Sequence, residues 1–396
     1  MKKKEIKKKE KETKKKNIDL KKPINLSFKE KKNSREKSFT NLIKGKTCFA
    51  FDFGDYATKI AIAKISNDKI ELKNLLVVEN DERKSKIETS NVNEWHDKLS
   101  KAFSTNNIST FGQYAVCTVG SRYYISRQME VPYAEEKDML GLIAYEMSQS
   151  LSLDKDSYYF QYKLISTYEK NGGKVCNVWV AALKKTLCDT YYELLDSFKL
   201  KPLIMDINVD GLERIFAADS KLGEFAKGGS VATIDFGMHG TEVNIFNNGK
   251  YIQGSNVNVG DGKFVSAAKN VLGIQISDIH NGNKLIVDPK IVYGITRQPE
   301  MANSKIFASV LEEWLAEVGM IIKRYNISYP NAQVSKIFMY GGSPQQAWLK
   351  YFVEEYLGIK VLLIKKLDCV DVPKAYEQEE NLIPQCLNAI SLFLMK

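Results

Sequence analysis

The sequence has few of the residues from which metal sites and disulfide frameworks are built. It contains 6 cysteines and 3 histidines among 396 residues, without a Cys-x-x-Cys pair or a metal-like spacing of histidines. A structural zinc site and a disulfide framework are therefore not expected. No apolar run reaches the ~18 residues that a membrane-spanning helix needs. The lysine-rich N-terminus also lacks the apolar stretch of a signal peptide, so a soluble cytosolic protein is predicted.

The positive charge is concentrated at the N-terminus. Residues 1–46 hold 19 Lys and Arg against 6 Asp and Glu, a net of +13, whereas the whole chain carries +10. A segment so charged and so poor in apolar residues is predicted to be a disordered tail. It serves either solvation or contact with an anionic membrane surface, where each Lys or Arg contributes about 1 kcal/mol. Nucleic acid is not expected as a partner, because only Phe28 and Phe39 are available for base stacking.

After the tail, the pattern of strands and helices repeats itself. Residues 48–65 and 231–257 each indicate an apolar strand, an Asp-Phe-Gly turn and a following strand, half a chain apart. Between these copies, 114–120 and 123–131 indicate a hairpin that turns at Ser121-Arg122. A segment follows whose apolar residues recur every three to four positions, which indicates a helix. This middle part has the character of an insertion. The predicted fold class is α/β with two similar lobes.

Three strand ends share residue types that contact phosphates. Each combines an apolar strand with glycine, and two add an aspartate and a further polar group: Asp52, Gly54 and Lys59; Asp235, Gly237 and Thr241; Gly341 and Gly342. Glycine lets backbone N–H groups approach phosphate oxygens. An aspartate at a strand end can hold Mg²⁺ through water, and a lysine can neutralise a terminal phosphate. A single Asp-x-Gly is more often only a turn, but two copies with a late Gly-Gly predict two lobes closing on a nucleotide.

In this order, the three strand ends resemble those of the superfamily of actin, the heat-shock chaperones and the sugar kinases. Within it, the chain from about Thr47 onward resembles the PilM family of type IV pilus assembly proteins, which is related to the division protein FtsA. Further segments follow the same pattern, namely Val116–Pro132, Asp156–Tyr162, Met205–Ile207 and Val259–Gly262. The resemblance implies an actin-like (ribonuclease H-like) two-lobed fold with an inserted β/α subdomain of the FtsA/PilM type.

The resemblance also implies how the chain is divided. Its parts are a tail at 1–46, a first lobe formed by 47–111, 202–228 and 370–396, an inserted subdomain at 112–201 and a second lobe at 229–369. ATP and Mg²⁺ are the implied cofactors. Residues that would line the phosphate and Mg²⁺ site are Asp52, Gly54, Lys59, Asp235, Gly237 and Thr241, with Asp52 and Asp235 holding Mg²⁺ through water. Those that would lie near the adenosine are Gly341, Gly342 and Lys284.

Other positions bear on hydrolysis. Asp206 and Asp210 lie where the connecting segment of the superfamily passes the attacking water, and the sequence does not choose between these catalytic candidates. The chain departs from the family pattern at Asp55, a carboxylate beside the triphosphate, and at 277–283, where a turn replaces an acidic helix before Lys284. Reduced affinity and at most slow ATPase activity are expected.

The implied function is that of a cytoplasmic nucleotide-binding scaffold, peripheral at the inner face of the cytoplasmic membrane. It would dock the cytoplasmic segment of a PilN-like single-span membrane protein. An FtsA-like division protein that polymerises at the membrane is the alternative, disfavoured because the chain stops at 390–396 without a terminal amphipathic helix. A small-molecule kinase of the same superfamily is more remote, because no catalytic base is readable beyond the two aspartates.

One segment of the tail resembles the partner rather than the family. PilN-like partners typically enter with Ile-Asn-Leu, and the tail contains Ile24, Asn25 and Leu26. The tail is therefore predicted to compete with the partner, by self-docking or by linking protomers, which adds self-association to the expected contacts. Coincidence is the alternative interpretation, since a three-residue match is common.

Overall fold

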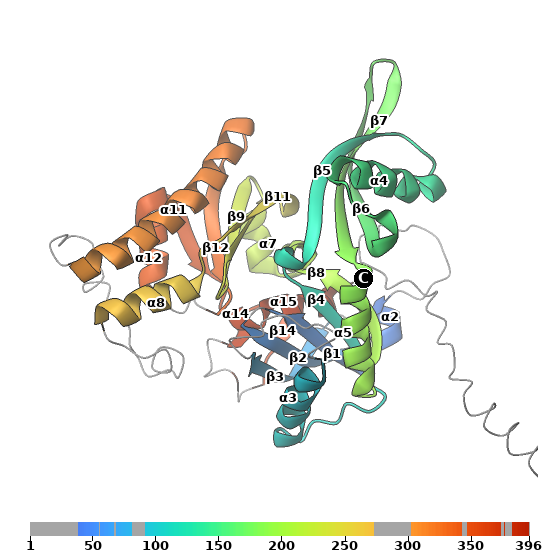
Figure 1. Ribbon diagram of the computed structural model, residues 1–396, viewed down its shortest axis with the longest axis vertical. Helices are drawn as coiled ribbons and strands as arrows, with labels where there is room; N and C mark the ends of the chain where they lie inside the picture. The colour runs from blue at the N-terminus through green and yellow to red at the C-terminus, as the bar shows by residue number, and fades with distance from the viewer. Residues whose placement is uncertain are drawn as a thin grey trace, which may run out of the picture.

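The computed structural model describes residues 39–54, 56–66, 69–80, 92–272, 302–342, 347–373, 376 and 382–395. The strands in this part of the chain form three sheets, of six, five and three strands (Figure 1). Helices contact both of the larger sheets, so the protein is α/β, as predicted.

The six-stranded sheet has the order β14-β3-β2-β1-β4-β8. Its strands are β1 (Thr47–Phe53), β2 (Ala57–Ser66), β3 (Lys69–Glu79), β4 (Tyr114–Val119), β8 (Lys201–Ile207) and β14 (Val370–Asp371). β1 to β3 form an antiparallel meander, while β4 runs parallel to both β1 and β8. The helices and the 3₁₀ turn that contact its strands are α3 (Val92–Thr105), α5 (Lys185–Ser197), α6 (Asn208–Ala218), α15 (Leu387–Ser391) and η3 (Leu392–Leu394).

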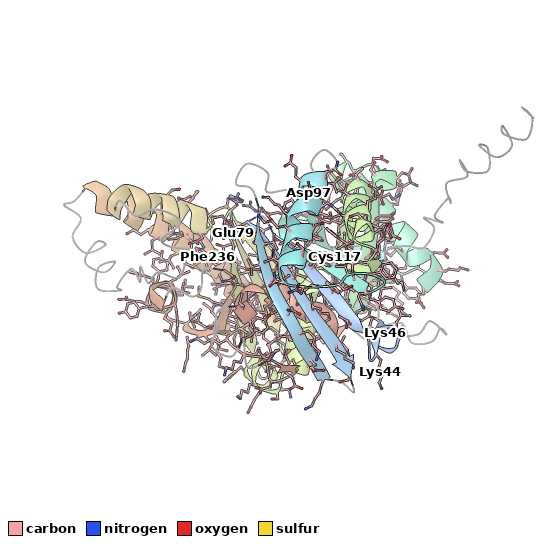
Figure 2. The ribbon with its side chains drawn as sticks, turned by 90° about the horizontal axis from the view of Figure 1, so that it is seen from below. Lys44, Lys46, Glu79, Asp97, Cys117 and Phe236 are labelled. Atoms are coloured by element: carbon pink, nitrogen blue, oxygen red, sulfur yellow. The ribbon has the colours of Figure 1, made fainter. Side chains whose placement is uncertain are left out.

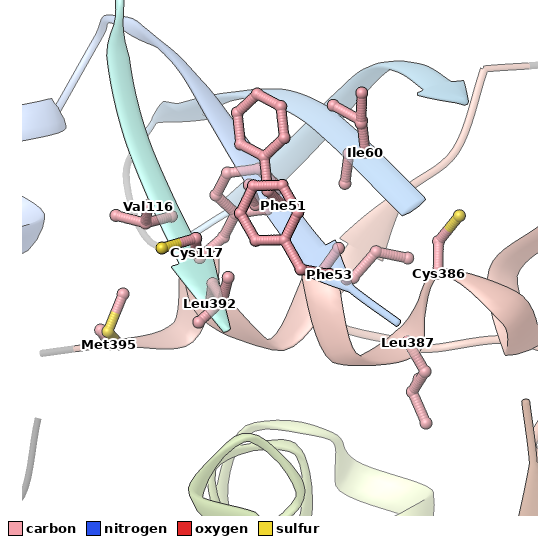
Figure 3. Close-up of a cluster of buried hydrophobic side chains, with 14 of the residues drawn as sticks. Phe51, Phe53, Ile60, Val116, Cys117, Cys386, Leu387, Leu392 and Met395 are labelled. Carbon is pink, nitrogen blue, oxygen red and sulfur yellow. The ribbon is translucent and has the colours of Figure 1, made fainter. Parts of the chain in front are cut away.

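Alternation along β1 separates an aromatic face from a polar one. Phe51 and Phe53 point to one side, where their rings contact Phe103 of α3 and Tyr191 of α5, respectively. Because successive side chains alternate across a strand, Asp52 faces the opposite side. There the C-terminal segment with α15 and η3 packs under β1 and β4 (Figure 3). The strand thus buries its aromatic rings against two helices and presents Asp52 toward α15.

The five-stranded sheet has the order β11-β10-β9-β12-β13 and repeats this arrangement. Its strands are β9 (Ser230–Phe236), β10 (Thr241–Asn247), β11 (Lys250–Val257), β12 (Val334–Tyr340) and β13 (Lys360–Leu363). β9 pairs antiparallel with β10 and parallel with β12, as β1 does with β2 and β4. The helices beside it are α7 (Ser220–Ala226), α8 (Asp261–Leu272), α11 (Ala302–Ser328) and α12 (Ala347–Leu357). The predicted repeat of strand, Asp-Phe-Gly turn and strand is therefore confirmed.

Alternation along β9 has the same effect as along β1. Phe236 packs against Phe264 of α8 and Trp314 of α11. Asp235, its neighbour, faces the other side of the sheet, where Phe338 of β12 contacts α6. Both strand-end aspartates are thereby turned toward the central helices α6 and α15.

The three-stranded sheet has the order β5-β7-β6 and carries α4 (Glu136–Leu151) on one face. Its strands are β5 (Tyr124–Pro132), β6 (Tyr158–Lys170) and β7 (Gly173–Lys184). Asn171 and Gly172, with φ of 52° and 77°, form the two-residue turn between β6 and β7, which matches a type I′ hairpin. Buried residues under α4, including Met139, Ile143 and Val178, form a core separate from those of the larger sheets.

The hairpin predicted around Ser121-Arg122 is wrong. β4 lies between β1 and β8, whereas β5 pairs with β7 in another sheet. The turn η1 (Ser121–Tyr123) therefore connects two sheets. The predicted inserted unit, 112–201, also contains β4 and α5, which belong to the six-stranded sheet and its helical cover. We propose a narrower insertion, from η1 to the end of β7.

Part of the predicted tail, 1–46, is folded in the structure. Helix α2 (Phe39–Ile43) buries Phe39 and Ile43 in the first core, and the Gly45 N–H donates to the Ile65 carbonyl at 2.7 Å. Residues 39–46 thus pack with the first sheet. Lys46 lies at the end of the sheet remote from Glu79 (Figure 2). Among the described helices, none is long and apolar enough to cross a membrane.

Candidate functional site

The two Asp-Phe-Gly turns meet at one cleft between the two larger sheets. The cleft has a volume of about 670 Å³, including the part open to solvent. The turns after β1 and β9, strands β10 and β11, η1 and α15 all contribute to its walls. Six residues predicted from the sequence line it: Asp52, Gly54, Lys59, Asp235, Gly237 and Thr241.

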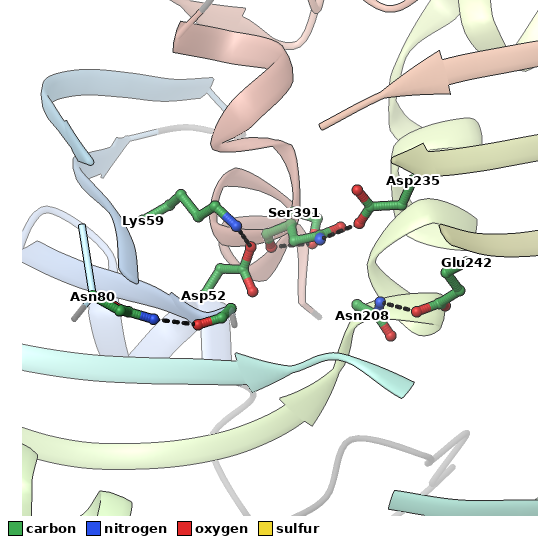
Figure 4. A network of polar contacts seen from close by, with 9 residues as sticks. Asp52, Lys59, Asn80, Asn208, Asp235, Glu242 and Ser391 are labelled. Carbon is green, nitrogen blue, oxygen red and sulfur yellow. Dashed lines mark hydrogen bonds and ion pairs between the residues drawn. The ribbon is translucent and has the colours of Figure 1, made fainter. Parts of the chain in front are cut away.

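Strand register explains why Asp52 and Lys59 lie together. The two residues are cross-strand partners in the antiparallel pair β1–β2, so their side chains share one face. Lys59 Nζ lies 3.6 Å from Asp52 Oδ2 (Figure 4). Burial alone would lower the pKa of Lys59, but the Asp52 and Asp235 carboxylates outweigh it and raise that pKa. Lys59 is therefore a firmly charged cation at the base of the cleft.

Asn388 of α15 lies beside both strand-end aspartates. Its Nδ2 donates to Asp235 Oδ2 at 3.0 Å, and its side chain lies close enough to Asp52 to oppose the rise that burial causes in the pKa of that carboxyl. Burial raises the pKa of Asp52, against the lowering by Lys59. Burial raises the pKa of Asp235 to about 7, with Lys59 opposing and the Glu242 and Asp52 charges adding to the rise. The carboxylates of the cleft therefore carry more negative charge than Lys59 alone balances.

The second turn differs from the first in the sign of one charge. Glu242 is the cross-strand partner of Asp235, as Lys59 is of Asp52. The first hairpin thus pairs opposite charges, and the second pairs two carboxylates. Like charges so placed repel unless a cation or a proton lies between them. A bound cation would relieve this repulsion.

Glu242 also connects three parts of the fold. Its Oε2 accepts hydrogen bonds from Ser121 Oγ at 2.6 Å and from Asn208 Nδ2 at 2.7 Å. Its Oε1 accepts from Asn244 Nδ2 at 2.7 Å. Ser121 belongs to η1 and Asn208 to the start of α6, so the carboxylate bridges the second sheet to both. Figure 4 shows its contact with Asn208.

The Thr241 hydroxyl is already engaged inside the second lobe. It donates to the Val259 carbonyl at 2.7 Å and accepts from Trp314 Nε1 at 2.8 Å. These hydrogen bonds connect the second turn to the segment that follows β11 and to α11. The predicted contact of this hydroxyl with phosphate would require it to leave one of these partners.

The structure does not place the residues predicted near the adenosine in the lining of the cleft. Gly341 has a φ of 104°, and a Cβ there would lie 2.6 Å from Asp235 Oδ1, so glycine is needed for this close approach. Gly341 and Gly342 stand beside the cleft but do not line it. Lys284 and Asp55 lie outside the described residues, as does the tail segment Ile24, Asn25 and Leu26.

The two catalytic candidates flank Asn208, which lines the cleft, but are not lining residues themselves. Asp206 is the penultimate residue of β8 and forms an ion pair with Arg214, whose Nε donates to the Ser391 carbonyl at 3.4 Å. Asp210 is in the first turn of α6, and burial raises its pKa to about 7, with the Asp206 charge adding to the rise. Neither aspartate lines the cleft.

The donor set suits Mg²⁺ with phosphate. Asp52 and Asp235 supply hard carboxylate oxygens of the kind that Mg²⁺ binds directly or through water, and Lys59 supplies a charge for phosphate. Tyr340 lies at the end of β12, and its buried hydroxyl is close to these carboxylates. This hydroxyl has no hydrogen-bond partner among the residues that the structure describes. Across the described ranges, no group of three or more His, Cys, Asp or Glu side chains forms a complete metal site. A cation here would therefore complete its coordination with water or ligand oxygens.

Comparisons with known proteins bear on the family and the fold of the chain. A family model described as "Type IV pilus assembly protein PilM" matches residues 50–392. A solved PilM–PilN type IV pilus biogenesis complex is similar with a TM-score of 0.67 at 16% identity, covering 88% of this chain and 97% of that chain. The ethanolamine utilization protein EutJ from Carboxydothermus hydrogenoformans has a TM-score of 0.47 at 8% identity, covering 88% and 89%. A Bacteroides thetaiotaomicron protein with an actin-like ATPase fold and unknown function has 0.45 at 8%, covering 88% and 99%.

A search of curated proteins found no match. The family model nevertheless spans both Asp-Phe-Gly turns, the three-stranded sheet and α15. The fold is the actin-like one expected from the sequence, with two similar sheets and an additional β/α unit. The chain belongs to the PilM family of type IV pilus assembly proteins.

Proposed function

We propose that the protein is a cytoplasmic nucleotide-binding scaffold of a type IV pilus assembly machine, peripheral at the inner face of the membrane. It docks the cytoplasmic segment of a PilN-like single-span membrane protein. Family membership supports the process, and the solved PilM–PilN complex supports the kind of partner. The observation that carries the nucleotide part is the convergence of Asp52, Lys59 and Asp235 on one cleft.

The proposed ligand is ATP with Mg²⁺. Lys59 binds phosphate oxygens, while Asp52 and Asp235 hold the cation through water. The like-charged pair Asp235 and Glu242 supports this assignment, because a divalent cation removes the repulsion between cross-strand carboxylates. The glycines at 54 and 237 would let the two turns approach the phosphates.

We propose that hydrolysis is at most slow. Asp206 and Asp210 are the residues that would activate water, and neither lines the cleft. Asp206 is also neutralised by Arg214. A carboxylate held in this way is a poor general base, so binding rather than turnover is the proposed role of ATP.

The proposed docking site lies between the first lobe and the three-stranded sheet. β6 is an edge strand of that sheet, and its Leu164, Ile165 and Tyr168 are exposed. The first part of β6 lies beside α5, where Lys185 Nζ is 5.4 Å from the Tyr159 ring centroid. An edge strand offers free backbone groups to an extended peptide, and exposed apolar side chains offer contacts for it.

Nucleotide binding is tested by Lys59→Met, with Lys64→Met as the matched control. Lys64 is an exposed residue of the same strand β2. At 100 times the Kd, MgATP is expected to stabilise the wild type and the control by about 2.7 kcal/mol. Lys59→Met is expected to lose most of this stabilisation. Calorimetry and thermal denaturation that show no MgATP binding to the wild type would refute the nucleotide part.

A further inference from the structure

Arg122 is a second cation of the cleft, and it comes from the turn that connects two sheets. It is the central residue of η1, between β4 and β5, and it lines the cleft across from the second Asp-Phe-Gly turn. Its Nη2 donates to the His239 carbonyl at 2.5 Å. The guanidinium therefore spans from the first lobe to the turn after β9.

The surroundings of Arg122 leave a defined space for its guanidinium. A Cβ at Gly240 would lie 2.6 Å from Arg122 Nη2 and 3.0 Å from the Val257 carbonyl oxygen. A side chain at 240 would therefore displace the Arg122 guanidinium from this position or press on the Val257 carbonyl. The preceding residue is anchored as well, because Ser121 donates to Glu242 through both its hydroxyl at 2.6 Å and its N–H at 3.4 Å.

The other charges of the cleft indicate what Arg122 could bind. Lys59 is already paired with Asp52, and Asp235 and Glu242 add further negative charge. A polyphosphate entering this cleft needs positive charge beyond Lys59 and a metal ion. A planar guanidinium binds phosphate oxygens through two parallel N–H groups, and such charged hydrogen bonds are about twice as strong as neutral ones.

We propose that Arg122 is a phosphate-binding residue of this cleft and that a nucleotide polyphosphate takes its guanidinium from the His239 carbonyl. The inference rests on the proposed nucleotide binding and names a further residue of the same site. β5 begins two residues after Arg122, so the exchange also links occupancy of the cleft to the three-stranded sheet.

The test compares Arg122→Gln, Arg122→Lys and the control Arg127→Gln by calorimetry with MgATP and with adenosine. Glutamine can still donate to a backbone carbonyl but carries no charge, and Arg127 is an exposed residue of β5. Arg122→Gln is expected to weaken MgATP binding about 10- to 100-fold and to leave adenosine binding unchanged. Arg122→Lys should recover part of the loss, and Arg127→Gln should match the wild type.

The outcomes separate this inference from the proposed function. If the wild type binds MgATP and Arg122→Gln binds it equally well, the inference is wrong and the proposed function stands. If Arg122→Gln weakens MgATP and adenosine by the same factor, Arg122 only holds the two sides together and the inference is again wrong. A wild type that binds no MgATP overturns both. Circular dichroism and thermal denaturation of each variant confirm that it is folded before titration.

Discussion

Asn388 donates a hydrogen bond to one of two neighbouring buried carboxylates, so its replacement should be costly before any ligand is added. Asn388→Ala removes the donor that Asp235 accepts at 3.0 Å and takes a polar side chain away from the nearby Asp52. Hydrogen bonds to charged groups contribute about 1.5–3 kcal/mol each. Asp235, with a pKa of about 7, is partly protonated near neutral pH and needs the donor less. The free energy of unfolding is therefore expected to fall by about 1–2 kcal/mol, near the lower end of the range for one such bond.

Asn388→Asp should destabilise the protein more, because it places a third carboxylate between two others. Urea denaturation at pH 7.5 measures all variants, and Asn331→Ala is the control, since Asn331 is exposed in the turn before β12. The control is expected to lie within about 0.5 kcal/mol of the wild type. If Asn388→Ala is as stable as Asn331→Ala, the hydrogen bond from Asn388 to Asp235 does not stabilise the fold and the reasoning fails.

Three further predictions concern pH, the insertion and the tail. The pKa of Asp210 is about 7 in the folded state and about 3.9 in the unfolded state. Between about pH 3.9 and pH 7, the carboxyl is therefore protonated in the folded state and ionised in the unfolded state. Wild-type stability should fall by up to about 4 kcal/mol from this group as pH rises through that range, and urea titrations should show the slope reduced in Asp210→Asn but not in the exposed Asp371→Asn. Lys163 of β6 and Glu213 of α6, 2.5 Å apart, should couple by about 1–3 kcal/mol in a double-mutant cycle, and a negligible coupling would contradict a firm attachment of the three-stranded sheet. Removal of residues 1–38 should reduce flotation with anionic vesicles, most clearly at low salt, whereas equal flotation would assign attachment to the folded part.

The sequence predicted those features that depend on local patterns. Short apolar runs that end in Asp-Phe-Gly identified β1 and β9, and the repetition of these turns identified the cleft. The hairpin around Ser121-Arg122 was wrong, because the alternation of a strand does not specify its partner and a 3₁₀ turn has the composition of a loop. Helix α2 was missed, since Phe39 and Ile43 are few apolar residues at the end of a charged segment.

In the candidate site, too, local patterns predicted some residues, whereas others depend on long-range packing. Asp52 and Lys59 face each other because a tight hairpin fixes their register. The same seven-residue step from Asp235 leads to Glu242, so this residue was within reach of sequence reasoning and was overlooked. Asn388 was not, because its approach depends on how α15 packs against β1, β2 and β4 and reaches Asp235 of β9. Long-range packing of a short helix leaves no periodic signal in the sequence.

The most direct test of the scaffold proposal is a calorimetric titration of the full chain with a peptide of the cytoplasmic segment of the PilN-like partner. Saturable one-to-one binding is expected, with and without MgATP. It should be weakened by Ile165→Asp on the exposed face of β6 and strengthened by removal of residues 1–38, if Ile24–Leu26 competes for the same site. Unchanged affinity in Ile165→Asp would refute the docking site beside β6. Absence of binding to the wild type under both conditions would contradict the scaffold function itself.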